Sequence, residues 1–347
     1  MKSPRLVRRL VALLGIGAGV LAMPALAQDC PELVGSLPGD NYRAIAASGD
    51  YAYVGTDIFR VIDVSNPSTP VEVGFTDLPG TALDIAVEGN YAYVGVVSNT
   101  GLGVIDVTWP TAPVEVGFVP TPDRPSGVAV SDGYAYVANE VGLRVIDVTT
   151  PAFPFEVGFL DPPGREWDVA VAGGYAYLMA EDAIPPFYNF GRLSVIDVST
   201  PSSPVEMGFV EGPGSKRVAV SGGYVYVTSS DDPGAWPVPG IGVIDASNPS
   251  APVEVGFLGM SDPSGVAVSG GYAYVSDYEG GLRVIDVSEP TAPVEVGFYQ
   301  SYASGVAVSD GYVSLVALGG LYVFRECPLF TDGFESGDTS AWSATVP

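Results

Sequence analysis

A fifteen-residue string recurs six times along this 347-residue chain and constrains the fold more than any other feature. The first copy reads VIDVSNPSTPVEVGF, and successive copies start 41 to 50 residues apart. Self-similarity at such a period is typical of solenoids and propellers, in which each repeat packs only against its neighbours. The copies occupy residues 61–75, 104–118, 145–159, 195–209, 243–257 and 284–298.

Each repeat contains four short segments with the alternating pattern of β-strands. In the third repeat Asp132-Gly133 joins the first two segments, which is a strong signal for a tight hairpin. Four antiparallel strands in about 42 residues form one blade of a β-propeller. In the third repeat we expect strand a at residues 127–131, strand b at 134–137, strand c at 143–148 and strand d at 155–159.

The repeats predict an all-β, seven-bladed propeller that is closed by its own N-terminal strand. The tyrosine-containing strand b occurs seven times, starting at residues 51, 91, 134, 175, 224, 272 and 312. Strand c also occurs seven times, but only six copies of strand d follow a strand c. The seventh strand d lies at residues 31–35. We therefore expect a 3+1 closure in which this strand completes the last blade, because closing the ring removes open sheet edges.

The two cysteines support this closure. When the repeats are aligned, Cys327 takes the place of Ser247 and Cys30 takes the place of Ala251, and these two positions flank one turn between strands c and d. A Cys30–Cys327 disulfide would then replace the missing covalent turn. Because it closes a loop of almost the whole chain, it would contribute about 4–5 kcal/mol in the chain-entropy model.

The string GLRVIDVSEPTAPVEVGFY at residues 281–299, together with its copies, resembles the LVIVD-repeat family. The resemblance spans residues 31–326. It implies a β-propeller protein of a bacterial or archaeal cell surface. The family has no settled biochemical activity, so the resemblance implies architecture and supplies no catalytic residues.

The N-terminus has the features of a secretory signal peptide. A basic segment with Lys2 and three arginines precedes an apolar stretch at residues 10–21, and Ala25-Leu26-Ala27 fits signal-peptidase cleavage. The alternative is an uncleaved anchor. We predict a signal peptide at 1–27, a propeller at 28–328 and a flexible C-terminal tail at 329–347. The mature chain would lack a membrane span and lie outside the cytoplasm, in the periplasm or at the cell surface.

Composition excludes several classes of function. The formal net charge is −26, which argues against nucleic acid as a partner. The chain contains no histidine and only two cysteines, so catalysis by Ser-His-Asp or Cys-His groups and thiolate metal sites are excluded. We expect no cofactor and no bound metal.

Residues that recur in every repeat are interpreted as scaffold. We expect the repeated aspartate after strand c to cap its turn by accepting backbone N–H groups. The paired tyrosines of strand b are expected to pack between neighbouring blades and to supply much of the core. The aspartates are Asp63, Asp106, Asp147, Asp197, Asp245 and Asp286.

Residues that break the repeat are the candidate site. The loops between strands b and c and between strands d and a vary, and they share one face of a propeller, whereas the turns of the other face are uniform. Variable loops on a rigid scaffold commonly carry function. Two long b–c loops, at 179–192 and 228–240, belong to adjacent blades, and the residues that open strand a in these blades are distinctive. The candidate ligand-binding residues are Arg43, Arg165, Glu166, Trp167, Asp168, Tyr188, Lys216, Arg217 and Trp236.

These residues suit an anionic or carbohydrate ligand, although a structural salt bridge explains the charged pairs equally well. The first hypothesis is a non-enzymatic, monomeric binding scaffold that recognises a protein or a glycan at the cell envelope. The second is a glycoside hydrolase or lyase that uses carboxylates such as Glu166, Asp168, Glu181 or Asp182. The third is a purely structural surface or adhesion component.

Overall fold

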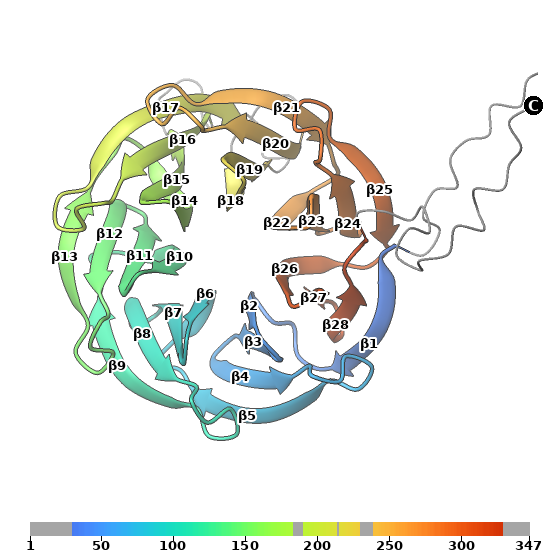
Figure 1. Ribbon diagram of the computed structural model, residues 1–347. Coiled ribbons are helices and arrows are strands. Elements are labelled where there is room, and N and C mark those ends of the chain that lie inside the picture. The colour runs from blue at the N-terminus through green and yellow to red at the C-terminus, as the bar shows by residue number, and fades with distance from the viewer. Residues whose placement is uncertain (1–29, 183–189, 214, 230–238, 329–347) are drawn as a thin grey trace, which may run out of the picture.

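The computed structural model describes residues 30–182, 190–213, 215–229 and 239–328. These residues form 28 strands in seven four-stranded sheets, and they contain no helix. The sheets are arranged around a central axis as the blades of a propeller (Figure 1). The all-β, seven-bladed fold expected from the repeats is therefore confirmed. The predicted signal peptide and C-terminal tail lie outside the described residues.

Each blade is built from strands that follow one another in the chain, except the last. Blades 1 and 2 comprise β2 (Ala44–Ser48), β3 (Tyr51–Gly55), β4 (Ile58–Asp63), β5 (Val71–Asp77), β6 (Thr81–Glu88), β7 (Tyr91–Val97), β8 (Gly101–Asp106) and β9 (Val114–Pro120). Blades 3 and 4 comprise β10 (Pro125–Ser131), β11 (Tyr134–Asn139), β12 (Gly142–Asp147), β13 (Phe155–Leu160), β14 (Arg165–Ala172), β15 (Tyr175–Asp182), β16 (Phe190–Asp197) and β17 (Val205–Pro213). Blades 5 and 6 comprise β18 (Ser215–Ser221), β19 (Tyr224–Ser229), β20 (Gly240–Asp245), β21 (Val253–Gly259), β22 (Pro263–Ser269), β23 (Tyr272–Asp277), β24 (Gly281–Asp286) and β25 (Val294–Tyr299). Blade 7 comprises β26 (Ala303–Ser309), β27 (Tyr312–Ala317), β28 (Gly320–Arg325) and β1 (Glu32–Pro38).

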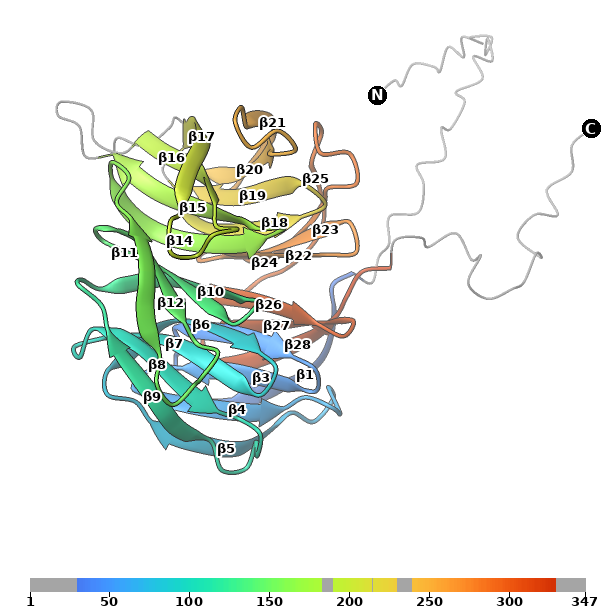
Figure 2. The same cartoon turned by 60° about the vertical axis from the view of Figure 1, so that its left-hand side comes forward.

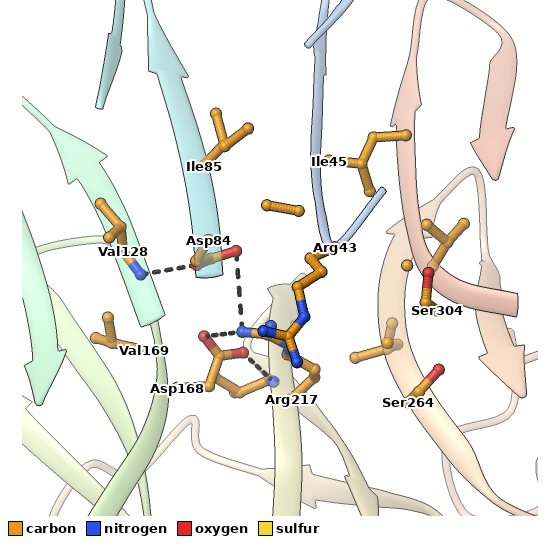
Figure 3. A pocket seen from close by; sticks show the side chains of 16 residues that line it. Arg43, Ile45, Asp84, Ile85, Val128, Asp168, Val169, Arg217, Ser264 and Ser304 are labelled. Atoms are coloured by element: carbon orange, nitrogen blue, oxygen red, sulfur yellow. Dashed lines mark hydrogen bonds and ion pairs between the residues drawn. The ribbon is translucent and has the colours of Figure 1, made fainter. Parts of the chain in front are cut away.

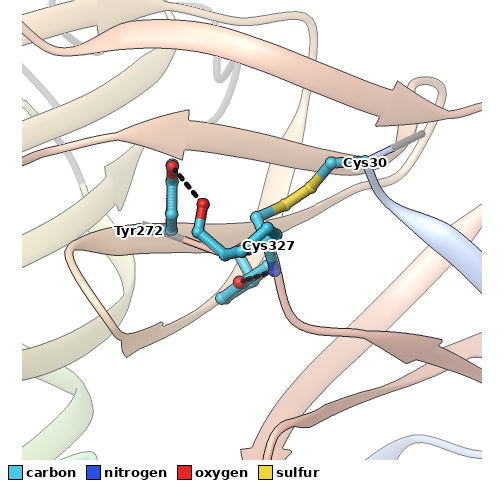
Figure 4. Close-up of a disulfide and its surroundings, with 5 residues drawn as sticks. Cys30, Tyr272 and Cys327 are labelled. Carbon is cyan, nitrogen blue, oxygen red and sulfur yellow. Dashed lines mark hydrogen bonds between the residues drawn. A yellow bond between two sulfur atoms is a disulfide. The ribbon is translucent and has the colours of Figure 1, made fainter. Parts of the chain in front are cut away.

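The ring is closed by the N-terminal strand, as predicted. β1 pairs antiparallel with β28, and Glu32 lies opposite Arg325. Figures 1 and 2 show β1 beside β28 on the outer rim of blade 7. A disulfide joins Cys30 to Cys327, whose Cα atoms are 5.6 Å apart (Figure 4), and the Cys327 N–H donates a hydrogen bond to the Tyr274 hydroxyl at 2.9 Å. The predicted bridge therefore replaces the missing turn between strands c and d.

The hydrophobic core lies between the blades. The second tyrosine of a strand b is buried against the next blade: Tyr93 of blade 2 packs in one cluster with Val128 and Val137 of blade 3. Seven such clusters are present in the described part of the chain, and each joins two neighbouring blades. The tyrosine pairs are thus core residues, as expected.

A glycine in strand d sets the spacing between blades. A Cβ atom on Gly117 would lie 2.1 Å from the carbonyl oxygen of Pro151, which belongs to the turn of the next blade. Only a residue without a side chain permits this approach. Between blades 6 and 7, the disulfide-bonded Cys30 takes the place of the proline. A Cβ on Gly297 would lie 2.0 Å from the Cys30 carbonyl oxygen. The same contact joins Gly35 to Pro67, Gly74 to Pro110, Gly158 to Pro201, Gly208 to Pro249 and Gly256 to Pro290.

The repeated aspartates cap turns, as predicted. Oδ1 of Asp63 accepts the N–H of Ser65 at 2.9 Å, and each of the other five aspartates accepts the N–H of the residue two positions later. Hydrogen bonds from Ser199 and Ser247 hold the pKa of Asp197 and Asp245 below the usual range. These carboxylates therefore belong to the scaffold.

Candidate functional site

A polar cavity of about 190 Å³ lies on the propeller axis, at the end where the innermost strands begin. All seven blades contribute residues to its wall. Its lining residues lie in or just before the first half of the innermost strands (Figure 3), on the side of the d–a and b–c loops, which we call the variable-loop face. The sequence placed the candidate site at this position.

One wall of the cavity is an ion-pair network centred on Arg217. Its Nη1 atom lies 3.5 Å from Oδ1 of Asp168 and 3.8 Å from Oδ1 of Asp84. The same guanidinium donates hydrogen bonds to the carbonyl oxygens of Ser126 and Leu83 at 3.2 and 3.3 Å. Arg217 therefore joins four blades through its side chain, and most of its donors are occupied.

Each carboxylate of the network also ties its own blade to the next one. Oδ2 of Asp84 accepts the N–H of Val128 at 2.7 Å, and Oδ2 of Asp168 accepts the N–H of Val218 at 2.8 Å. Both contacts are drawn in Figure 3. The two aspartates occupy equivalent positions in blades 2 and 4, so the same local geometry serves both.

Burial dominates the electrostatics of this wall. Desolvation raises the pKa of Asp168 to about 7, although Arg217 and the backbone N–H groups act in the opposite direction and Asp84 adds to the rise. Desolvation likewise raises the pKa of Asp84, and Arg217 opposes it. One guanidinium therefore compensates two buried carboxyl groups only in part.

Serine hydroxyls replace the carboxylates on the opposite wall. The Ser264 hydroxyl donates to the carbonyl oxygens of Ser276 and Ala303, at 3.0 and 3.1 Å. The Ser304 hydroxyl reaches the Tyr42 carbonyl at 3.1 Å and so links blade 7 to blade 1. These hydroxyls therefore make this wall polar without adding charge.

Arg43 lines the cavity from blade 1 and carries an exposed guanidinium (Figure 3). The described residues include ten lysines and arginines, and eight of them form an ion pair with a carboxylate. The two that form none are Arg43 and Arg124. Both lie at the variable-loop face, Arg43 in the d–a loop before β2 and Arg124 in the d–a loop before β10. Although the net charge is −26, the described lysines and arginines that lack a carboxylate partner thus both lie at this face.

Three of the predicted site residues, Arg43, Asp168 and Arg217, come together in the cavity. Arg165, Trp167 and Lys216, also predicted, are not among the residues that line it. Trp167 donates from Nε1 to Glu181 at 2.9 Å and lies under the Arg165 guanidinium, 4.7 Å from its ring centroid. Arg165 pairs with Glu140, and Lys216 pairs with Asp262 at 3.0 Å. Glu166 is fully buried and is not among the cavity-lining residues.

Tyr188 and Trp236, the aromatic residues predicted from the two long loops, lie outside the described residues. Sequence reasoning did not single out Asp84, Ser264 and Ser304, which also line the cavity. The signal for Asp84 was present, because Leu83-Asp84 aligns with Trp167-Asp168 at the start of strand a. The serines give no such signal, because similar Ser-Gly pairs open strand a in several blades.

Within the described ranges, no group of three or more acidic or cysteine side chains is placed to hold a metal ion. The same part of the chain contains no helix long and apolar enough to span a membrane. The arrangement on the axis is thus a polar cavity with one partly neutralised wall and one free guanidinium.

These features define a seven-bladed β-propeller with an axial polar cavity. The model of the LVIVD repeat matches six segments of the chain, residues 39–77, 79–121, 125–161, 163–211, 214–258 and 261–301. Because these segments cover more than half of the sequence, the chain belongs to the LVIVD repeat family, as the resemblance implied.

Solved structures show the same fold. The computationally designed Ika8 protein is similar over 84% of this chain and 99% of its own, with a TM-score of 0.59 and 14% identity. BamB from Moraxella catarrhalis is similar over 83% of this chain and 84% of its own, with a TM-score of 0.55 and 14% identity. A comparison with the curated proteins finds no match. At such identities the structural likeness concerns the fold alone.

Proposed function

We propose that this protein is an exported, non-enzymatic binding scaffold that recognises a protein or a glycan of the cell envelope through its variable-loop face. The observation that carries the proposal is the asymmetry of the two faces. The variable-loop face combines the axial cavity with Arg43 and Arg124, the two guanidiniums without a carboxylate partner among the described residues. The opposite face consists of short turns that repeat with little change from blade to blade.

Export is supported by two features. The first 27 residues have the basic, apolar and small-residue segments of a signal peptide. The Cys30–Cys327 disulfide fits an oxidising compartment such as the periplasm or the cell surface. The protein acts as a monomer in this proposal, since the closed ring leaves no blade without a neighbour on either side.

The alternative enzymatic function is less well supported by the geometry. Catalysis by a pair of carboxyls requires one group free to donate a proton and another free to attack or to activate water. Asp84 and Asp168 each accept a backbone N–H from the next blade, and both face Arg217. Their oxygens are engaged in holding the ring together, so the network resembles a structural link.

A binding screen with a catalytic control tests this function. The mature chain, residues 28–347, is applied to glycan arrays and to immobilised envelope proteins of known identity. The expected result is a specific ligand whose affinity falls at least tenfold in Arg43→Ala, Arg124→Ala or the double variant, because an anion loses its counter-charge. Arg325→Ala is the matched control, since that exposed arginine lies at the opposite face. Turnover of any bound polysaccharide that disappears in Asp168→Asn would overturn the non-enzymatic proposal.

A further inference from the structure

Three exposed apolar side chains gather on the variable-loop face beside blades 6 and 7. Tyr278, Tyr302 and Leu318 are 55%, 56% and 59% exposed. The two tyrosine rings contact each other edge to face, with centroids 6.1 Å apart and an interplanar angle of 68°. We call these three residues the tyrosine platform. Neither of its tyrosines belongs to the recurring core pairs of strand b.

The platform is held in place by the backbone of adjacent loops. The N–H of Tyr278 donates to the Asp262 carbonyl at 2.8 Å, and the N–H of Leu318 donates to the Tyr302 carbonyl at 2.8 Å. The next bond in this series, from Gly39 to the Gly319 carbonyl at 3.0 Å, joins the platform to the loop that carries Arg43. Backbone hydrogen bonds between neighbouring loops therefore connect the platform to the loop that carries Arg43.

The platform lies on the same face as the axial cavity and is joined to its wall through the chain. Tyr302 is two residues before Ser304, which lines the cavity wall, and Arg43 follows in the next blade around the ring. Other exposed aromatic residues lack such a setting. Trp109 and Phe153 project from c–d turns on the opposite face, and the exposed phenylalanines of the outer strands recur from blade to blade as part of the repeat.

The size of the cavity limits what enters it. Sites that enclose a whole small ligand commonly measure about 300–1,000 Å³. A cavity of about 190 Å³ is smaller and suits one charged substituent, so the rest of a ligand must lie on the surface around the mouth. The tyrosine platform offers exposed apolar surface on the same face, and Arg43 supplies the charge.

The backbone geometry of this face argues against an extended peptide. A peptide is commonly captured by adding a strand to an open sheet edge. Here the strands meet the variable-loop face with their ends, and the unpaired edges of each blade face the central channel or the outer rim. Recognition must therefore use side chains: flat rings, a guanidinium and hydroxyl oxygens.

From this juxtaposition we propose that the tyrosine platform and Arg43 form a binding site for an acidic oligosaccharide. One carboxylate of the glycan occupies the mouth of the axial cavity at Arg43, and a neighbouring sugar ring packs its apolar C–H face on Tyr278 or Tyr302. Rigid amphipathic rings suit such a contact, because tyrosine loses little conformational entropy on binding. This inference rests on the proposed function and names its ligand class.

Isothermal titration tests the site with defined probes. Hexamers of galacturonate, mannuronate and guluronate are compared with the same hexamers after reduction of their carboxyl groups. At least one acidic hexamer binds, and carboxyl reduction weakens its affinity about tenfold or more, as expected for a lost charge-assisted pair. Arg43→Ala abolishes the preference for the acidic form. Tyr302→Ala weakens both forms about tenfold, whereas Tyr302→Phe, which keeps the ring, retains most of the affinity.

Trp109→Ala is the control, because it removes an exposed aromatic ring from the opposite face and is expected to leave all affinities unchanged. If no acidic hexamer binds, but a protein or acidic peptide binds in a manner that requires Arg43, this inference is overturned and the proposed function stands. If a hexamer binds with the same affinity to Arg43→Ala, Arg124→Ala and Tyr302→Ala, the ligand lies elsewhere and both proposals fail. Each substituted side chain is exposed, so all variants are expected to fold.

Discussion

At the scale of single residues, the Arg217 side chain both links several blades and forms part of the cavity wall. Arg217 faces Asp84 and Asp168 and also bonds to carbonyl groups of two further positions. Because burial raises the pKa of Asp168 to about 7, this carboxyl is easier to protonate in the folded chain than in the unfolded one. The network therefore changes its charge near neutral pH.

The raised pKa of Asp168 predicts a pH-dependent stability. Its contribution to the free energy of unfolding is largest below the ordinary pKa of an aspartate and is lost as pH rises from about 4 through about 7, with a slope of at most about 1.4 kcal/mol per pH unit. In Asp168→Asn this contribution is absent. Urea unfolding of both proteins between pH 4 and pH 8 should show the variant gaining stability relative to the wild type as pH increases. A difference that stays constant over this range would contradict the assigned pKa.

The sequence could point to site candidates where a residue differs in chemical type from its counterparts in the other repeats. Arg43, Asp168 and Arg217 stood out because charged or bulky residues replace serine and glycine at the start of strand a. All three line the axial cavity, while their binding role remains a prediction. Glu166 is adjacent in sequence but fully buried, because a bulge in β14 between Glu166 and Asp168 alters which side chains face the axis. Such a bulge has no signature in the alternation of apolar residues.

At the scale of elements, the outer two strands of most blades are linked by an ion pair. Arg60 of β4 bonds to Glu72 of β5 at 3.0 Å, and Arg283 of β24 bonds to Glu295 of β25 at the same distance. In blade 2 the arginine position is occupied by Gly103. Partial desolvation raises the pKa of Glu115, the glutamate of that blade.

Restoring the arginine of blade 2 should be tolerated. A Cβ on Gly103 would lie 3.8 Å from the nearest neighbouring atom, so Gly103→Arg can place its guanidinium beside Glu115 without a clash. We expect a gain in unfolding free energy of up to about 1 kcal/mol, the range of surface pairs, and a lower pKa for Glu115. Urea unfolding and NMR titration of the glutamate measure both. An unchanged pKa would show that the pair does not form.

The opposite outcome is expected at the glycine of strand d. In Gly117→Ala the new methyl group would lie about 2.1 Å from the Pro151 carbonyl oxygen, which the rigid turn of the next blade holds in place. Overpacking of this kind costs about 1–3 kcal/mol. Thermal unfolding should therefore separate the two substitutions in the neighbouring strands β8 and β9. Equal stability of Gly117→Ala and the wild type would mean that blade spacing is not fixed by this contact.

The strands themselves were predictable because the repeat supplies six aligned examples of each. The starts of all seven b strands are confirmed at the predicted tyrosines. The a strands begin earlier than expected: β10 starts at Pro125, where residue 127 was predicted. Of the two additional residues, Pro125 lies opposite Asn139 and Ser126 forms a bulge. A proline before the alternating segment resembles a turn in sequence.

At the scale of the whole molecule, closure depends on a pairing between residues almost 300 positions apart. The disulfide has a sequence separation of 297, and β1 contributes a complete outer strand to blade 7. The closure could be predicted because the last repeat lacks a strand d, while an additional strand d stands at the N-terminus, at residues 31–35. The positions of the long loops relative to the cavity could not be read in the same way, since insertions do not align with any repeat.

Removal of the disulfide should loosen the ring at blade 7. In Cys30→Ser/Cys327→Ser the unfolded chain regains its loop entropy, and we expect the unfolding free energy to fall by about 4–5 kcal/mol. Equilibrium unfolding measures this loss. Hydrogen exchange should show the earliest loss of protection in β1 and β28. Uniform loss of protection in all blades would indicate that the bridge acts only by restricting the unfolded chain and does not hold β1 against β28.

The place where β1 closes the ring also determines which face of the propeller lies near the ends of the described chain. Cys30 and Pro328, the ends of the described chain, lie at the c–d turns, and the Tyr272 hydroxyl donates to the Pro328 carbonyl on that same side. The axial cavity and the tyrosine platform lie at the opposite ends of the strands. A propeller tethered at Cys30 or Pro328, to a resin, a sensor chip or a fused protein, therefore has its variable-loop face on the side away from the tether.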